Sequence, residues 1–272
     1  MTAVGRAGVL GRPVAHSLSP VLHTAAYREL GLDWTYEAID CGVDELPAVL
    51  AERADWAGFS CTMPLKHAAL DVAVEVAPIA RAVGVANTLL PRPDGWVADN
   101  TDVAGIVSAL SEHAVVPRTA TILGAGGTAQ AALAALLAVG ASAATVLVRD
   151  AARAARALDV AARLGLDVEV GVLVADAPAL AADLIVSTLP PGAADPIADR
   201  AWTDVQAVLD VAYSPWPSAL AVAARSGGAT VVSGALMLLH QAAAQVSLMT
   251  GLDAPVAAMR LALDAAAPGC GV

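Results

Sequence analysis

The sequence predicts an α/β protein whose second half forms a parallel, doubly wound sheet. Short apolar runs alternate with helix-forming stretches along most of the 272 residues. Such alternation is typical of parallel strands joined by right-handed helical crossovers. A glycine-rich segment also separates a strand-like run at 119–123 from a helical stretch, which is a common strand–turn–helix arrangement.

The first hundred residues contain strands and helices in turn. We expect strands at 7–10, 34–40 and 58–62, with a loop over 11–19 after the first. Ser19 and Pro20 indicate a helix start, Ser19 as N-cap and Pro20 at the first helical position, and this helix ends at Gly31. Further helices are predicted at 45–53 and 65–76. The runs at 87–90 and 96–99 flank a turn at 92–95 and predict a hairpin.

Beyond residue 102 the alternation becomes regular. A helix through Ile106 and Leu110 leads to Pro117. Strands are then expected at 119–123, 144–148, 168–174, 184–189, 207–211 and 230–233, and helices at 129–139 and 151–164. Two helices, 237–248 and 254–266, close the sequence.

Composition and charge exclude several classes of protein. Hydrophobic residues make up 57% of the chain, yet its longest apolar stretches are Ala-rich and contain Gly and Ser. A membrane-spanning helix needs about 20 residues of stronger hydrophobes, so a membrane protein is not expected. The net charge of −11 argues against nucleic-acid binding. Three widely spaced cysteines and five histidines show no metal-ligand spacing, and we expect a cytoplasmic protein without a metal.

The glycine-rich segment matches a dinucleotide-binding fingerprint of the form G-x-G-x-x-A. In this pattern the first glycine allows a tight turn and the second lets the backbone approach a pyrophosphate. A small third residue lets helix and strand pack closely. The segment therefore predicts a Rossmann lobe that binds a dinucleotide through Gly124, Ala125, Gly126, Gly127, Thr128 and Ala129.

The end of the next strand bears on which dinucleotide is bound. NAD-binding folds usually place Asp or Glu there, to accept hydrogen bonds from ribose hydroxyls. This chain instead has Arg149, with Arg153 one turn later. Both guanidinium groups could hold a 2′-phosphate, which favours NADP, with NAD as the alternative. Asp150 is an unfavourable neighbour for a phosphate unless it points away as a helix cap.

Lys66 and Asp102 each follow a strand-like run, 36 residues apart. Alone, Lys66 could be a solvated surface residue and Asp102 a helix N-cap. As a pair in a polar pocket they would have catalytic chemistry. An ammonium stabilises developing alkoxide charge and exchanges a proton with it, and the carboxylate orients the amine.

These residues resemble the shikimate dehydrogenase family along essentially the whole chain. The N-terminal G-x-P-x-x-H-S-x-S-P signature runs from Gly11 to Pro20. The V-T-x-P-x-K motif covers 61–66, with Cys61 in place of Val, and the counterpart of G-A-x-N-T covers 84–88. N-T-D-G-x-G covers 100–105, with Val103 departing from the pattern. The C-terminal motif covers 234–241, and the family's Asn-Arg-Thr phosphate-binding run appears as 148–150.

The resemblance implies a role for each matching residue. Lys66 and Asp102 would form the catalytic dyad. Ser17 and Ser19 would bind the substrate carboxylate with help from Tyr213. The remaining implied residues hold the ring hydroxyls, namely Thr62, Asn87 and Gln241, or line the nicotinamide side of the cofactor, namely Thr188, Gly234 and Met237.

The resemblance also implies architecture and activity. A substrate-binding domain at 1–101 would be completed by 237–272, whose helices pack back on it, and 102–236 would form the NADP-binding Rossmann domain. The implied reaction is the reversible NADP-linked reduction of 3-dehydroshikimate to shikimate by a monomer or homodimer. One alternative is a quinate or mixed quinate/shikimate dehydrogenase, which could use NAD in place of NADP. An alternative of another class is a protein that senses a dinucleotide without catalysing a reaction. Serine at both 17 and 19 favours shikimate over quinate, and an intact Lys66–Asp102 pair argues against a sensor.

Overall fold

The computed structural model describes residues 5–270, which pack into two compact units, each considered by itself. The first unit contains the residues up to Asp102 together with Leu238–Pro268. The second contains Val103–Met237 and the residues from Gly269. Each unit is built around one six-stranded sheet with helices, so the α/β class predicted from the sequence is confirmed.

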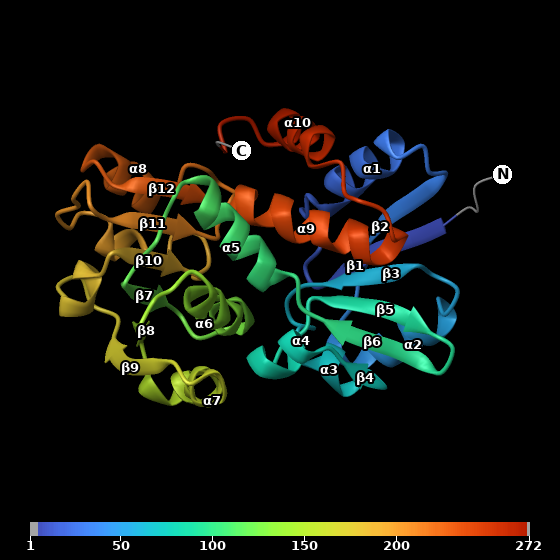
Figure 1. Ribbon diagram of the computed structural model, residues 1–272, viewed down its shortest axis with the longest axis horizontal. Coiled ribbons are helices and arrows are strands. Elements are labelled where there is room, and N and C mark those ends of the chain that lie inside the picture. The colour runs from blue at the N-terminus through green and yellow to red at the C-terminus, as the bar shows by residue number, and fades with distance from the viewer. Residues whose placement is uncertain (1–4, 271–272) are drawn as a thin grey trace. The chain divides into compact units, whose positions relative to one another are not determined.

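The first unit has a mixed sheet in the order β2-β1-β3-β5-β6-β4 (Figure 1). β1 pairs in parallel with β2 and β3, whereas β5 is antiparallel to both β3 and β6. The short edge strand β4 runs parallel to β6. The strands are β1 (Gly5–Gly11), β2 (Trp34–Asp40), β3 (Gly58–Cys61), β4 (Glu75–Val76), β5 (Thr88–Arg92) and β6 (Gly95–Asp99).

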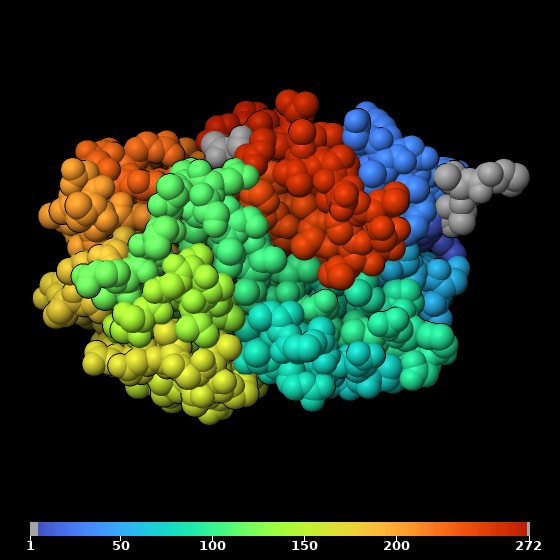
Figure 2. All heavy atoms as spheres, in the orientation of Figure 1, coloured from blue at the N-terminus to red at the C-terminus, as the bar shows by residue number. Residues whose placement is uncertain are grey.

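Helices cover this sheet, and the C-terminal helices return to the N-terminal part of the unit. α10 packs against α1, and Figure 2 shows the side chains of the C-terminal helices in red beside those of α1 in blue. Leu10, Phe59 and Leu89 are fully buried in the core between the sheet and its helices. The helices are α1 (Ser19–Glu29), α2 (Leu46–Glu52), α3 (Ala68–Asp71), α4 (Pro78–Val83), α9 (Gly234–Thr250) and α10 (Val256–Ala266), α9 beginning in the second unit.

Two local predictions for this unit are wrong. The helix expected over 65–76 is only the single turn α3, because Val74 N–H donates to the carbonyl oxygen of Trp96 and the chain joins the sheet edge as β4. Ser19 is not the N-cap of α1 but its first residue, and Leu18 is the N-cap. The Ser17 hydroxyl oxygen instead accepts the Ser19 N–H at 3.3 Å, so the capping hydroxyl lies two residues earlier.

The second unit has an all-parallel sheet in the order β12-β11-β10-β7-β8-β9. Chain order reverses between β7 and β10, which is the topological switch point of a Rossmann fold, where ligands bind at the carboxyl ends of the strands. The predicted strands are all present. They are β7 (Thr119–Leu123), β8 (Ala143–Val148), β9 (Asp167–Val172), β10 (Leu184–Ser187), β11 (Ala207–Asp210) and β12 (Thr230–Ser233).

Helices connect these strands. The helix expected from Ala151 starts as a 3-10 turn, Ala151–Ala154, before α7 begins. A further helix, α8, was not predicted, although Ser218 caps it by accepting the Ala221 N–H at 3.1 Å. The α-helices are α5 (Asp102–Glu112), whose first residue belongs to the first unit, α6 (Gly127–Ala138), α7 (Ala155–Leu164) and α8 (Ala219–Ser226). Within residues 5–270, no helix has both the length and the apolar character needed to cross a bilayer.

Candidate active site

The carboxyl ends of β1 and β3 place several predicted residues at one edge of the first sheet. The two strands are adjacent and parallel, with Leu10 opposite Cys61. Thr62 follows β3 directly, and its N–H donates to the Leu10 carbonyl oxygen at 2.9 Å. The loop after β1 carries Ser17, and the loop after β3 carries Lys66.

Asn87 and Asp102 reach the same edge from the antiparallel hairpin. Asn87 precedes β5, where its carbonyl oxygen accepts the Cys61 N–H at 2.7 Å. Its own N–H donates to the carbonyl oxygen of Asp99, the last residue of β6, at 3.0 Å. Asp102 lies three residues beyond that strand end, as the first residue of α5. The Lys66 carbonyl oxygen accepts the Ala86 N–H at 2.8 Å, which ties the loop after β3 to the approach of β5.

Lys66 and Asp102 form an ion pair in this place. Lys66 Nζ donates to Asp102 Oδ2 at 2.5 Å, and the two side chains are 17% and 6% exposed. The other carboxylate oxygen, Oδ1, accepts from Asn87 Nδ2 at 2.9 Å. Both oxygens of Asp102 are therefore engaged by donors, and charge-assisted bonds of this kind are stronger than neutral ones. The carboxylate is therefore held in one orientation, between the Lys66 ammonium and the Asn87 amide.

Gln241 of α9 also reaches Asn87. Its Oε1 accepts from Asn87 Nδ2 at 3.3 Å, while its own Nε2 donates to the Leu238 carbonyl oxygen at 3.0 Å. The structure thus brings together four residues predicted from the sequence, Lys66, Asn87, Asp102 and Gln241. Their roles in binding and catalysis stay predictions.

The predicted carboxylate-binding serines lie at the start of α1. Ser19 is buried, and Ser17 is partly exposed. The hydrogen bond from Ser19 N–H to Ser17 Oγ fixes the first turn of the helix beside both hydroxyls. Anions bind well at such a position because the first backbone N–H groups of a helix have no partner within it.

In the second unit, the glycine loop lies at the switch point between β7 and β10. Gly124 follows β7 with a φ of +98°, a conformation that side chains rarely adopt. A Cβ there would lie 2.9 Å from Thr188 Oγ1, which follows β10. That hydroxyl donates to the carbonyl oxygen of Leu123 at 2.8 Å. The left-handed backbone of Gly124 and the hydrogen bond of the Thr188 hydroxyl therefore both stabilise the tight turn at the start of the glycine loop.

The same loop fits a pyrophosphate. Gly126 is the N-cap of the 12-residue helix α6, and a Cβ built on it would meet nothing within 4 Å. Open space in front of a helix N-terminus lets phosphate oxygens approach the backbone N–H groups. Ala129 is fully buried, so a larger residue at the third fingerprint position would not fit. Ala125, Gly127 and Thr128 complete the turn and the first residues of the helix.

Arg149 and Arg153 are exposed beyond the end of β8. No ion pair involves either guanidinium among residues 5–270. Asp150 accepts the Ala152 N–H at 3.0 Å and so caps the 3-10 turn, as expected if it is to avoid a phosphate. The two arginines are therefore available to an anion on this surface.

Gly234 and Met237 begin α9. A Cβ on Gly234 would overlap the Val211 carbonyl oxygen, so glycine is required there for backbone packing, whatever its role toward a cofactor. Met237 is buried. The packing requirement at Gly234 is a physical reason for this glycine that the sequence alone does not show.

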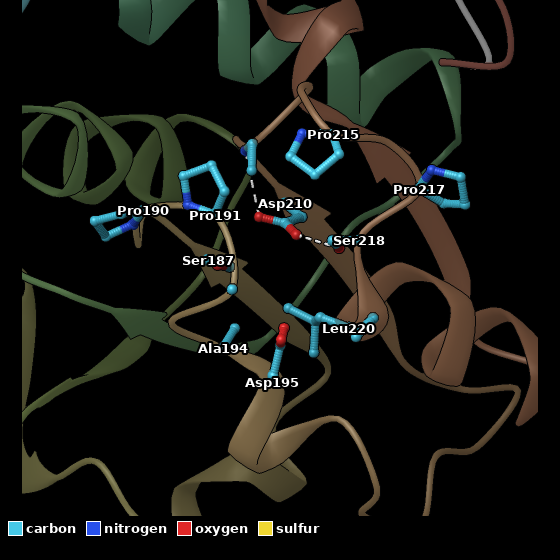
Figure 3. A pocket seen from close by; sticks show the side chains of 13 residues that line it. Ser187, Pro190, Pro191, Ala194, Asp195, Asp210, Pro215, Pro217, Ser218 and Leu220 are labelled. Atoms are coloured by element: carbon cyan, nitrogen blue, oxygen red, sulfur yellow. Dashed lines mark hydrogen bonds between the residues drawn. The ribbon is translucent and has the colours of Figure 1, made fainter.

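Tyr213 lies in the second unit, in the loop after β11. Other residues of that loop and of the loop after β10 line a cavity of about 140 Å³. Figure 3 shows the carboxylate of Asp210 at this cavity, hydrogen-bonded to the loop that follows β11. It accepts from Ser218 Oγ at 2.6 Å and from the Ala212 N–H at 3.3 Å. Burial raises the pKa of Asp210, and these bonds oppose the rise. Asp210 thus anchors the loop that carries Tyr213.

The buried residues Gln245, Ser60 and Thr88 adjoin the site, yet no role was assigned to them from the sequence. Gln245 Nε2 donates to the Asn87 carbonyl oxygen at 3.1 Å and to Thr88 Oγ1 at 2.9 Å. Gln245 lies four residues after Gln241, hence on the same face of α9. Two glutamines at this spacing, on one face of a largely apolar helix, are the signal that could have identified Gln245.

Comparison with known proteins agrees with this arrangement. Residues 9–89 match the model of the shikimate dehydrogenase substrate binding domain, and residues 234–263 match that of the shikimate 5'-dehydrogenase C-terminal domain. A shikimate dehydrogenase (NADP(+)) from Halobacterium salinarum is 41% identical over 271 residues, covering 95% of this chain and 98% of the relative.

Two solved structures give the same result. The shikimate dehydrogenase of Mycobacterium tuberculosis is 46% identical with a TM-score of 0.86, covering 96% of this chain and 99% of that one. The shikimate 5-dehydrogenase of Thermus thermophilus, solved with NADP(H) and shikimate, is 34% identical with a TM-score of 0.82, covering 96% and 99%. Identity at this level across nearly the whole of each protein shows that the chain belongs to the shikimate dehydrogenase family.

Proposed function

We propose that this protein catalyses the reversible, NADP-dependent reduction of 3-dehydroshikimate to shikimate. The observation that carries the proposal is the buried Lys66–Asp102 ion pair, whose carboxylate is also fixed by Asn87. Family relatives named for this reaction support it. A protein that only sensed a dinucleotide would have no need of an amine held in this way.

The chemistry follows from the groups present. A nicotinamide held beside Thr188, Gly234 and Met237 would supply the hydride for the substrate carbonyl carbon, or would accept it in the reverse direction. Lys66 stabilises the alkoxide charge that develops on the oxygen and gives it a proton. In the reverse direction the Lys66 amine takes the hydroxyl proton. Asp102 keeps the amine in place, and Asn87 keeps Asp102 in place.

Lysine is chemically necessary for this role. Lys66 is the only lysine in the sequence, whose other 14 basic side chains are arginines. An arginine guanidinium keeps its proton at all ordinary pH values, whereas an ammonium can exchange one. The chain therefore has lysine at the one position where the proposed reaction requires proton exchange.

Substrate and cofactor recognition are proposed as follows. Ser17, Ser19 and Tyr213 bind the substrate carboxylate, and Thr62, Asn87 and Gln241 bind the ring hydroxyls. The glycine loop at 124–129 holds the pyrophosphate, Arg149 and Arg153 hold the 2′-phosphate of NADP, and Thr188, Gly234 and Met237 line the nicotinamide side. Support comes from the open backbone at Gly126 and the absence of ion pairs at both arginines among residues 5–270.

Steady-state oxidation of shikimate and of quinate, each with NADP and with NAD, tests the proposal. We expect the highest kcat/KM for shikimate with NADP. A preference for quinate would instead establish the quinate dehydrogenase alternative, and a preference for NAD would remove the 2′-phosphate role of the arginines. Binding of NADP without turnover of either acid would support the remaining alternative, a dinucleotide-sensing protein.

We further propose that the enzyme works in the cytoplasm as a monomer or homodimer. The three cysteines, Cys41, Cys61 and Cys270, are buried, and none of them is in a disulfide among residues 5–270, which suits a reducing compartment. Sedimentation velocity over a range of concentrations distinguishes the two oligomeric states, and a larger assembly would contradict both.

A further inference from the structure

A chain of buried hydrogen bonds runs behind the catalytic pair and ends at Gln245. Tyr36 Oη and Ser60 Oγ are 2.5 Å apart, and Ser60 Oγ donates to Gln245 Oε1 at 2.7 Å. Gln245 Nε2 then donates to the Asn87 carbonyl oxygen and to Thr88 Oγ1. Thr88 Oγ1 donates in turn to Asn87 Oδ1 at 2.9 Å. The side chains from Tyr36 to Asn87 are all buried, so an unpaired group among them would be costly.

The direction of every bond in this chain is determined by two backbone groups. The Asn87 carbonyl oxygen only accepts, so the amide nitrogen of Gln245 must face it and Oε1 must face Ser60. Ser60 therefore donates to Gln245 and accepts from Tyr36. Because Thr88 Oγ1 accepts from Gln245, its proton is directed to Asn87 Oδ1.

The second backbone group fixes the Asn87 amide. The Thr101 N–H only donates, and it donates to Asn87 Oδ1 at 2.8 Å. With Oδ1 facing Thr101 and Thr88, the amide nitrogen must face Asp102 Oδ1. A rotation of this amide by half a turn would place its oxygen against the carboxylate, which would repel it and displace it from Lys66.

We propose that Gln245 is a positioning residue of the enzyme: by holding the Asn87 peptide and the Thr88 hydroxyl, it fixes the Asn87 amide that orients Asp102 against Lys66. This inference rests on the proposed function for its activity readouts. Gln245 is separate from Gln241, one helical turn earlier, whose Oε1 accepts from the Asn87 amide itself. Gln245 acts only through the two groups to which it donates, the Asn87 carbonyl oxygen and the Thr88 hydroxyl.

Gln245→Leu and Thr88→Val are the primary variants, since each removes one link and keeps the approximate side-chain shape. Gln206→Leu is the matched control. Gln206 is also buried, and its Nε2 donates to the carbonyl oxygens of Leu180 and Ala182, in the second unit. The Gln206→Leu control shows how much stability and activity are lost when a buried amide that has no connection to Asp102 is removed.

We expect both primary variants to lower kcat for shikimate oxidation by about tenfold to 100-fold, because small displacements of catalytic groups cost rate in this range. KM for shikimate should rise by a smaller factor than the fall in kcat, although Asn87 is also proposed to bind a ring hydroxyl. The control should keep its kcat at a comparable loss of Tm. The proposal is overturned if both variants keep kcat within about twofold of the wild type, or if KM rises in step with the fall in kcat.

Gln245→Glu provides a readout that a merely structural role would not change. A protonated carboxyl group can still donate toward Asn87 or Thr88, whereas the ionised form cannot. In the wild type, burial raises the pKa of Tyr36 and that of Cys61, the latter to about 12, and lowers that of His23 to about 3, against an opposing hydrogen bond with Gln245. The kcat of this variant relative to wild type should rise as pH falls from about 9 to about 6. A constant ratio contradicts the proposal.

A measurement without turnover separates this inference from the proposed function. Because Lys66 is the only lysine, ¹⁵N-lysine labelling gives a single side-chain NMR signal. Loss of the Asp102 contact should speed exchange of the Lys66 ammonium protons with water by about tenfold in Gln245→Leu and Thr88→Val, but not in Gln206→Leu. Unchanged exchange in both variants overturns the positioning role. A wild type that is inactive on shikimate but shows this pattern would reject only the proposed function.

Discussion

Lys66 Nζ donates to Asp102 Oδ2 at 2.5 Å, and this contact joins two loops that are 36 residues apart in sequence. Neither residue is distinctive alone. Their proximity results from the sheet order, since β3 ends beside the start of β5, and β6 returns antiparallel to the same edge. Asn87 and Asp102 are brought to Lys66 by this hairpin.

Replacing Lys66 should abolish most turnover while sparing the fold. Lys66→Ala is expected to lower kcat by about 10²–10⁴, through lost proton transfer and alkoxide stabilisation. Lys66→Arg is the informative partner because it keeps the charge but cannot exchange the proton. Steady-state kinetics and shikimate binding by calorimetry should show kcat falling much more than affinity in both variants. Near-normal turnover by Lys66→Arg would mean that proton exchange at this position is not needed.

Gly126 should separate cofactor binding from stability. A Cβ at this position meets nothing within 4 Å, so Gly126→Ala should leave Tm nearly unchanged. The added methyl would nevertheless occupy the space through which a pyrophosphate approaches the backbone. Dissociation constants for NADP and NAD, measured by fluorescence titration, should rise by similar factors of about tenfold or more. Gly124→Ala is the contrast, because its φ of +98° and the contact with Thr188 predict a loss of stability as well. Unaltered affinity in Gly126→Ala would place the pyrophosphate elsewhere.

Arg149 should discriminate between the two dinucleotides. Arg149→Ala is expected to raise KM for NADP by the equivalent of about 1.5–3 kcal/mol, the range for a hydrogen bond to a charged group, and to leave KM for NAD nearly unchanged. Arg156, exposed on α7, is the matched control for loss of a surface charge. Equal effects of Arg149→Ala on both cofactors would show that it does not contact the 2′-phosphate.

The second sheet was predictable from sequence because most of its strands are short, largely apolar runs bounded by loop residues. Buried parallel strands lack the alternation of half-exposed ones, and runs such as Thr119–Leu123 and Thr230–Ser233 were placed at their observed bounds. The stretch 65–76 was not predictable in this way. Its apolar residues suit a helix locally. The hydrogen bond from the Val74 N–H to the Trp96 carbonyl oxygen instead places the end of this stretch at a sheet edge, and the sequence does not show that long-range pairing.

The candidate site shows the same limit. Motifs identified Lys66, Asn87, Asp102 and Gln241, because each belongs to a recognisable local pattern. Gln245 belongs to no motif, and its four-residue spacing from Gln241 is a weak signal. Its importance becomes clear once the Asn87 carbonyl oxygen is found 3.1 Å from its amide nitrogen. Gly234 is a related case, since its requirement for glycine comes from the Val211 carbonyl oxygen, 23 residues earlier in the chain.

Ser17 should influence which acid is preferred. Quinate differs from shikimate by a saturated ring and an added hydroxyl at the carbon that bears the carboxylate. If Ser17 and Ser19 bind that carboxylate closely, Ser17→Ala should weaken shikimate binding by about 0.5–1.5 kcal/mol, or more for a charged acceptor. It should also narrow the difference in kcat/KM between shikimate and quinate, because removing the oxygen makes room.

A control is needed because Ser17 Oγ also accepts the Ser19 N–H. Ser17→Ala therefore loosens the first turn of α1 as well, and Tm should be recorded for each variant. Ser17→Thr keeps the hydroxyl but removes one of the two serines that favour shikimate over quinate, so it should also narrow the preference for shikimate. An unchanged ratio in both variants, or a wild type that prefers quinate, would remove Ser17 from carboxylate recognition.

His23 should make the protein sensitive to acid. Its ring is fully buried, stacked on Tyr36 with the centroids 3.9 Å apart, and burial lowers its pKa to about 3. Between the ordinary histidine pKa of about 6.5 and this value, the unfolded chain binds a proton that the folded chain does not. The free energy of unfolding therefore has its full value above about pH 6.5 and falls by up to about 1.4 kcal/mol for each unit of acidification until the folded-state pKa is reached. Urea unfolding at a series of pH values should show this slope, and His23→Phe, which stays aromatic and does not titrate, should flatten it. Equal slopes in the two proteins would assign the acid sensitivity to the carboxylates instead.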